Sequence, residues 1–92
     1  MRNYVPFRTI ADSLAAGREI EFSSHGKAYS ITNSGGYWHF CCDTDGALLE
    51  TLCPFSDRRA LLARVAELRI EGVPLPRIFD TGDYDPSSLY IL

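Results

Sequence analysis

The chain has 92 residues, of which 46% are hydrophobic and 23% charged, and its formal charge is −3. The length predicts one domain, residues 1–92, and the composition excludes intrinsic disorder, which requires low hydrophobicity and high net charge. The acidic balance argues against nucleic acid as a partner, because phosphate contacts require clustered Lys and Arg, and no apolar run approaches the roughly 20 residues that cross a bilayer.

A short helix is predicted near residues 9–16. The segment Thr9–Asp12 fits a variant of the capping box, in which side chains at the helix start accept hydrogen bonds from free backbone N–H groups. Ile10 and Leu14 then fall on one face of the helix, and Gly17 can adopt the left-handed conformation that ends it. A helix of this length is unstable alone, so it must dock on another element.

The hydrophobic period then changes from that of a helix to that of a strand. Ile20 and Phe22 alternate with two glutamates, and side chains two apart on a strand share a face. Because Gly supplies the positive φ of a tight turn, turns are expected at residues 25–26, 33–36 and 43–46. Each connection is too short for a parallel crossover, which predicts an antiparallel meander. The expected strands lie around residues 20–22, 29–31, 37–42 and 47–52.

A second helix is predicted over residues 57–68. Ser56 suits the N-cap position, and Asp57 suits the first turn, where a negative charge interacts favourably with the helix dipole. The helix has an apolar stripe at helical spacing. The stripe consists of Leu61, Leu62, Val65 and Leu68.

The rest of the chain is expected to be an irregular tail. Leu75–Asp80 is predicted to form one more helical turn, with Pro76 at its start, and Asp85–Ser88 is predicted to form a turn. The last four residues, Leu89–Leu92, are unusually apolar for a terminus. We expect them to be docked on the domain or to form a homodimer interface.

Together these elements predict an α+β domain with an antiparallel three- to four-stranded meander sheet. A short N-terminal helix precedes the strands and a longer helix follows them, both packed on one face of the sheet. The predicted core consists of Ile20, Phe22, Tyr29, Ile31, Trp38, Phe40, Leu61, Leu62, Val65 and Leu68.

The cysteines indicate a reducing environment and no metal site. The chain has three of them, Cys41, Cys42 and Cys53, and two are adjacent. Disulfide-stapled secreted domains usually carry an even, spaced set, so we expect reduced thiols and a cytoplasmic location. No Cys or His pair has the close spacing of a structural zinc site, so we expect no metal and no cofactor.

An alternative function is that of a small-molecule-binding or hydrolytic domain centred on Tyr37, His39 and Cys41. His39 and Cys41 are two residues apart, so the imidazole could act as a base for the thiol if both lie on one strand. The sequence offers no third orienting group and no oxyanion hole. We therefore expect a non-enzymatic protein, with His39 and Cys41 on the sheet face opposite Trp38 and Phe40.

Negative charge is concentrated in two turn-rich stretches. Residues 43–56 and 79–92 each contain three acidic residues and no Lys or Arg. Asp83 and Asp85 flank Tyr84, so an aromatic anchor inside a negative rim would suit a basic groove on a partner, unless Tyr84 only covers the end of the core. The predicted partner-binding residues are Asp80, Asp83, Tyr84, Asp85, Asp43 and Asp45.

We therefore expect a small non-catalytic protein that binds a macromolecular partner, in the first place another protein. One form of this function is inhibition of a bacterial enzyme of nucleic-acid handling or defence, of the anti-CRISPR or anti-defence type, with carboxylates occupying a phosphate-binding groove. An immunity protein is a close variant. Both forms rest on analogy of size and charge alone.

Overall fold

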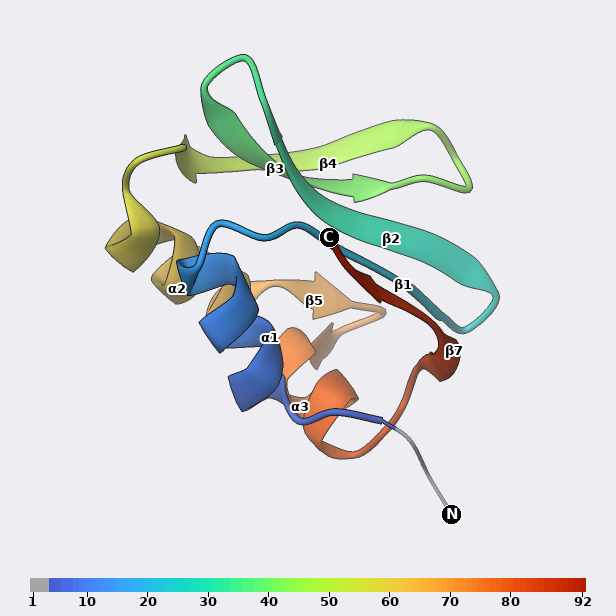
Figure 1. Cartoon of the computed structure of the whole chain (residues 1–92). Coiled ribbons are helices and arrows are strands. Elements are labelled where there is room, and N and C mark those ends of the chain that lie inside the picture. The colour runs from blue at the N-terminus through green and yellow to red at the C-terminus, as the bar shows by residue number, and fades with distance from the viewer. Residues whose placement is uncertain (1–3) are drawn as a thin grey trace.

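The computed structural model describes residues 4–92 as one five-stranded antiparallel sheet with three helices on one side of it (Figure 1). The predicted α+β class and antiparallel meander are confirmed, with one strand more than expected. The helices are α1 (Phe7–Ala15), α2 (Arg58–Glu67) and α3 (Leu75–Asp80). The sheet consists of β1 (Ile20–Ser24), β2 (Lys27–Ser34), β3 (Tyr37–Cys42), β4 (Ala47–Pro54) and β7 (Asp85–Ile91). The two remaining strands, β5 (Arg69–Ile70) and β6 (Val73–Pro74), form a separate hairpin.

The sheet has the strand order β4-β3-β2-β1-β7, so the first four strands follow the chain and β7 returns to pair with β1. The turn between β1 and β2 falls at His25 and Gly26, which have φ values of 52° and 80°. Two positive φ angles give the turn a twist that matches the twist of the two strands. The three turns predicted from glycine positions are confirmed.

Helix α1 begins at Phe7, so the capping box predicted at Thr9 is wrong. Thr9 lies inside the first turn, where its N–H donates to the carbonyl of Pro6 at 3.0 Å. The N–H of Phe7 instead donates to the Asp80 carboxylate at 2.8 Å. The cap therefore comes from a residue that is distant in the sequence, which a local pattern cannot reveal. Gly17, with a φ of 87°, follows the end of the helix as predicted.

Helix α2 begins one residue later than predicted. Its N-cap is Asp57 rather than Ser56, and the Asp57 carboxylate accepts from the N–H of Ala60 at 3.1 Å. Leu61 and Val65 are buried as expected, whereas Leu62 is only half-buried. The stripe that contacts the sheet is therefore narrower than the sequence pattern indicated.

The core lies between the sheet and the helices. Nine of the ten predicted core residues are buried, Leu62 being the exception. The largest buried side chains are Trp38 of β3, Phe22 of β1 and Phe79 of α3. The rings of Phe22 and Phe79 meet at an angle of 62° with centroids 4.9 Å apart. Helix α3 thus belongs to the core, and the helical segment predicted over Leu75–Asp80 is confirmed with the same bounds.

The segment Asp85–Ser88 was predicted as a turn and is instead the first half of β7. Turn-like hydrogen bonds are present, because the Asp85 carboxylate accepts from the N–H of Ser87 at 3.0 Å. They lie in an irregularity of the sheet edge, where the pairing of β1 with β7 shifts register between Glu21 and Ser23. An edge strand tolerates such a bulge and the proline within it.

The C-terminal residues are docked, as predicted. Leu89 and Ile91 pack against the core, and the N–H of Leu92 donates to the carbonyl of Glu19 at 2.8 Å. Tyr90 and Leu92 are exposed. The prediction of an irregular tail is wrong, because residues 69–91 form the β5–β6 hairpin, α3 and β7.

Candidate functional site

The two faces of the sheet differ in what covers them. Side chains of Phe22, Tyr29 and Trp38 belong to the buried cluster that also contains residues of α1, α2 and α3. Alternate residues of the same strands point to the opposite face, here called the outer face. Figure 1 shows all three helices on the core side, so none of them covers the outer face.

Large side chains remain exposed on the outer face. Tyr90 pairs with Glu21 across β7 and β1, and its side chain is 58% exposed. On the opposite edge strand, β4, Leu48 pairs with Cys41 and is also 58% exposed. Such scattered apolar groups are common on protein surfaces, so they show that this face is accessible and do not by themselves mark a binding patch.

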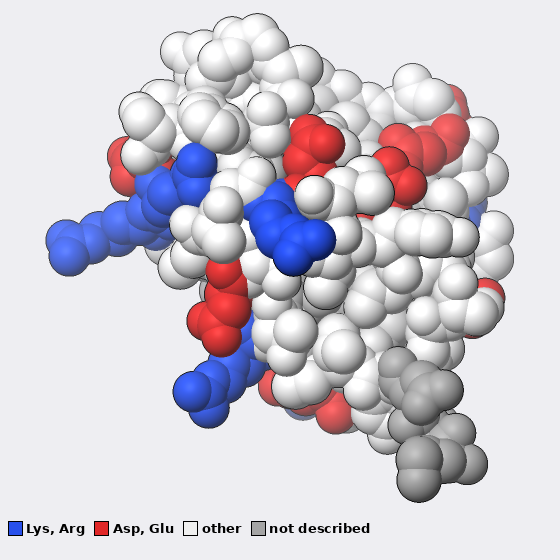
Figure 2. Space-filling model, in the orientation of Figure 1, with Lys and Arg blue, Asp and Glu red and all other residues white. Residues whose placement is uncertain are grey.

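The fold brings the two acidic stretches of the sequence to one end of the sheet. The turn between β1 and β2 lies between them: Lys27 forms an ion pair with Asp45 at 2.9 Å, and the His25 ring is hydrogen-bonded to the Asp83 carboxylate at 3.0 Å. Asp85 pairs with Ser23 in the strand register. In Figure 2 a group of Asp and Glu residues lies on the side of the sheet, whereas most Lys and Arg residues in view project from the side of the helices, where further acidic residues also lie.

The predicted residues of the first stretch hold the β3–β4 turn against β2. The N–H of Asp43 donates to the carbonyl of Ala28 at 2.8 Å, and the Asp43 carboxylate accepts from the Ser30 hydroxyl at 3.0 Å. The hydrogen bond and charge of Lys27 lower the pKa of Asp45, and Asp45 in turn raises the pKa of Lys27. Asp43 forms no ion pair with a basic side chain among residues 4–92.

Tyr84 is not a surface anchor but part of the core. Its side chain is only 6% exposed and contacts the rings of Phe22 and Phe79. Its hydroxyl group accepts from the N–H of Val5 at 2.7 Å. Burial raises the pKa of Tyr84, so the phenol is neutral at physiological pH. The sequence allowed Tyr84 to be either a partner-binding anchor or a residue that covers the end of the core, and the structure places it at the end of the core.

Each of the remaining predicted aspartates has its own hydrogen-bond partner. Asp83 is exposed and bonded to His25, and the hydrogen bond to Asp83 raises the pKa of His25 above its ordinary value. Asp85 accepts from both the N–H and the hydroxyl of Ser87. Asp80 accepts from Phe7 at the start of α1, so it has a capping role.

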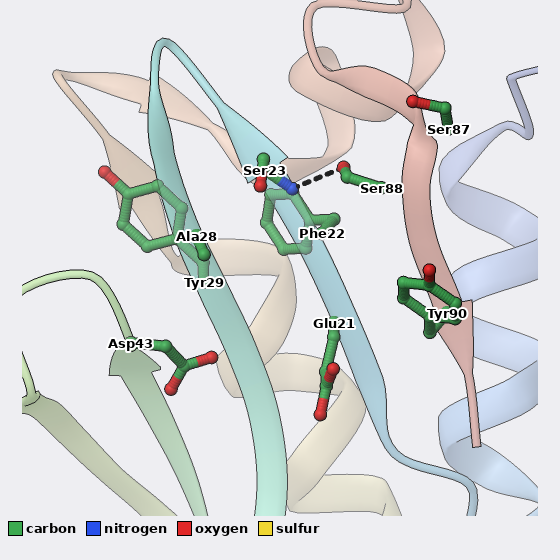
Figure 3. Close-up of a pocket in the computed structure, with 9 residues that line it drawn as sticks. All are labelled: Glu21, Phe22, Ser23, Ala28, Tyr29, Asp43, Ser87, Ser88 and Tyr90. Carbon is green, nitrogen blue, oxygen red and sulfur yellow. Dashed lines mark hydrogen bonds between the residues drawn. The ribbon is translucent and has the colours of Figure 1, made fainter.

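A groove of about 410 Å³ lies at the acidic end of the outer face (Figure 3). Its lining includes Glu21 and Ser23 of β1, Ala28 of β2, and Ser88 and Tyr90 of β7. Asp43 lines it from the β3–β4 turn. The N–H of Ser23 donates to the Ser88 hydroxyl at 2.7 Å, which joins the two strands where their backbone register is irregular.

Glu21 carries an unpaired charge in this groove. It is half-buried and lies between Ser30 of β2 and Tyr90 of β7 in the strand register. Within residues 4–92, its carboxylate takes part in no ion pair or hydrogen bond. A half-buried carboxylate with unused acceptor capacity attracts a cationic hydrogen-bond donor.

Sequence reasoning missed this groove. The alternation of Ile20 and Phe22 with acidic residues did indicate that Glu21 faces away from the core. The position of Tyr90 beside it depends on the pairing of β7 with β1, which joins residues about 70 apart in the sequence. No local pattern signals such a pairing.

The alternative site at Tyr37, His39 and Cys41 does lie on the outer face, opposite Trp38 and Phe40. The two ring nitrogens of His39 lie 3.3 Å from the Thr51 hydroxyl and 3.2 Å from the Ser34 carbonyl. Burial and the neighbouring Asp43 charge raise the pKa of the Cys41 thiol. An activated nucleophile needs a lowered pKa, so this geometry does not favour one at Cys41.

Two further findings concern other classes of site. Within the described part of the chain, no group of three or more His, Cys, Asp or Glu side chains is arranged to hold a metal ion. The helices of residues 4–92 are all too short or too polar to cross a membrane.

Comparisons with models of protein families, with curated proteins and with solved structures find no match for this chain. Its function is therefore inferred from its own surface.

Proposed function

We propose that this chain is a non-catalytic protein that binds another protein through the outer face of its sheet. The observation that carries the proposal is the groove at the acidic end of that face, with the unpaired Glu21 in its lining and the exposed Tyr90 beside it. Loops and uncovered faces that a rigid scaffold presents are the usual places for binding residues.

The charge around the groove favours a basic partner. Glu21 and Asp43 line it, and the lining contains no Lys or Arg. Asp83 and Asp85 lie beside it on the approach to β7. Negative charge around a binding surface accelerates association with a basic surface and makes that association sensitive to salt.

One form of this function is inhibition of a bacterial enzyme that handles nucleic acid, with the carboxylates taking the place of phosphates in the enzyme's groove. The support for it is that Asp43, which is about 40 residues from Asp83 and Asp85 in the sequence, is held on the same end of the sheet by strand pairing and by the β1–β2 turn. An immunity protein that neutralises a basic toxin would use the same surface.

The test is affinity capture from a bacterial lysate with two matched variants. Ala28→Arg places a long basic side chain in the groove, and Ala66→Arg places the same side chain on the exposed part of α2. A stoichiometric protein should be retained by the wild type and by Ala66→Arg and lost with Ala28→Arg. If the captured protein is lost only with Ala66→Arg, the binding surface lies on the helices and the proposal is refuted.

A further inference from the structure

The groove presents two kinds of contact to a ligand. Glu21 offers a carboxylate with both oxygens available, and Asp43 adds a second carboxylate at the rim. Tyr90 offers an exposed aromatic ring on the neighbouring strand, directly opposite Glu21 in the register. Figure 3 shows Glu21 on β1, with Asp43 toward one side of it and Tyr90 toward the other.

A planar cation matches both contacts. A guanidinium group binds a carboxylate through two parallel N–H···O bonds, and its flat face stacks on an aromatic ring. An ammonium group can pair with the carboxylate but has no flat face to stack. The molecule itself contains the stacking contact elsewhere, because the guanidinium carbon of Arg58 lies 4.7 Å from the centre of the Phe55 ring.

The basic groups nearest to the groove have partners of their own. Lys27 is paired with Asp45, and His25 with Asp83. Arg18 donates to the carbonyl of Ile91 at 3.1 Å, at the far end of β7. No described basic side chain lines the groove, so a cation for Glu21 has to come from another molecule.

We propose that the groove is a pocket for an arginine side chain of the partner protein, in which Glu21 pairs with the guanidinium and Tyr90 covers one of its faces. This inference rests on the proposed function and adds the chemistry of the partner. The long apolar stem of the arginine would cross Ala28 and Ser23, and the backbone of the partner would lie over the outer face. Charge complementarity selects this occupant over an apolar or acidic segment.

The pocket can be tested without knowing the partner. Nα-acetyl-arginine amide is titrated into the ¹⁵N-labelled protein, followed by the uncharged citrulline and the lysine analogues. With the arginine analogue, we expect saturable chemical-shift changes at the backbone amides of Glu21, Ser23, Ser88 and Tyr90. The changes should be much smaller with the lysine analogue and absent with the citrulline analogue. Equal shifts with citrulline would overturn the inference, and so would stronger ones with lysine.

Two variants locate the binding to the carboxylate. Glu21→Gln removes the charge in the groove, and Glu67→Gln removes the same charge from the exposed end of α2. Glu21→Gln should lower the affinity for the arginine analogue at least tenfold, and Glu67→Gln should leave that affinity unchanged. Both variants should have the melting temperature of the wild type. An unchanged affinity of Glu21→Gln would overturn the inference.

The captured partner separates the two proposals. Its affinity should fall at least tenfold with Glu21→Gln, and so should the affinity of the wild type when the partner's contacting arginine is replaced by Gln. If Ala28→Arg abolishes partner binding while Glu21→Gln has no effect, the outer face is the binding surface and the arginine pocket is refuted. If neither variant changes the affinity for the partner, the proposed function is refuted as well.

Discussion

The hydroxyl group of Tyr84 accepts a hydrogen bond from the backbone N–H of Val5, across 79 positions of the sequence. The same hydroxyl lies 3.3 Å from the Val5 carbonyl, to which it donates. Tyr84 therefore ties the segment before α1 to the segment before β7. The position that sequence analysis assigned to partner binding is one that closes the fold.

Two substitutions of Tyr84 should distinguish the contribution of its ring to stability from the contribution of its hydroxyl group. We expect Tyr84→Ala to lower the free energy of unfolding by about 3–5 kcal/mol, because it empties a space beside Phe22 and Phe79. Tyr84→Phe keeps the ring and should lower it by about 1 kcal/mol, since only the Val5 hydrogen bonds are lost. Urea denaturation measures both values, and equal effects of the two substitutions would contradict this assignment.

Arg58 should be the most important basic side chain for stability. Its guanidinium donates to the carbonyls of Phe55 and Ala15, at 3.1 and 3.0 Å, and lies over the ring of Phe55, which stacks on Trp38. It thereby joins the end of α1 to the start of α2. We expect Arg58→Ala to cost about 1–3 kcal/mol of unfolding free energy, from the lost hydrogen bonds and the cation–π contact.

The matched control is the neighbouring Arg59, which is exposed on the same helix. Arg59→Ala should change the unfolding free energy by less than about 0.5 kcal/mol, as is usual at surface positions. Thermal or urea unfolding of the two variants side by side makes the comparison. Similar effects at both positions would show that the contacts of Arg58 contribute nothing particular to the fold.

The local patterns of the sequence predicted most of the elements, and the reasons for the failures are physical. Glycine turns and the period-two alternation around Ile20 and Phe22 are local, so they located β1 to β4. The cap of α1 by Asp80, the burial of Tyr84 and the pairing of Tyr90 with Glu21 all join distant parts of the chain. The pairing of β7 with β1 places Ser88 and Tyr90 in the groove, so its existence could not be predicted from local patterns.

We expect that only some side chains of the C-terminal strand β7 contribute to the stability of the fold. Leu89 and Ile91 pack against the core, whereas Tyr90 is exposed. Removing residues 89–92 should lower the melting temperature and, by exposing the edge of β1, promote association of the chain. Ile91→Ser should reproduce much of the destabilisation, and Tyr90→Ser should not. A truncated chain that is monomeric and melts like the wild type would mean that β7 contributes no stability.

His25 should titrate above its ordinary pKa of 6.5, because Asp83 hydrogen-bonds to its ring and stabilises the charged form. A raised pKa in the folded state means that the pair stabilises the fold below about pH 6.5 and that this contribution disappears as the pH rises through the folded pKa. NMR titration of the imidazole measures the shift. Asp83→Asn should move the pKa of His25 back toward 6.5, and no movement would assign the shift to another cause.

The acidic residues beside the groove can be tested with Tyr84 left in place, because the loss of Tyr84 would strongly destabilise the domain. The double variant Asp83→Asn, Asp85→Asn removes two negative charges beside the groove, and Asn can still accept the hydrogen bonds that Asp85 receives from Ser87. We expect it to weaken binding of the captured partner at least about tenfold, or about 1.4 kcal/mol, mainly through slower association, and to flatten the dependence of affinity on salt.

The control for this experiment is the double variant Asp12→Asn, Glu67→Gln, which removes the same number of charges from exposed positions on α1 and α2. It should bind the partner like the wild type, because long-range charge effects are screened within about 10 Å at 0.1 M salt. Association and dissociation rates measured at several salt concentrations distinguish the two variants. If both weaken the partner equally, only the net charge of the chain matters and the acidic end of the sheet has no special role. If only the Asp83 and Asp85 variant does so, the rim beside the Glu21 groove steers the partner onto the outer face.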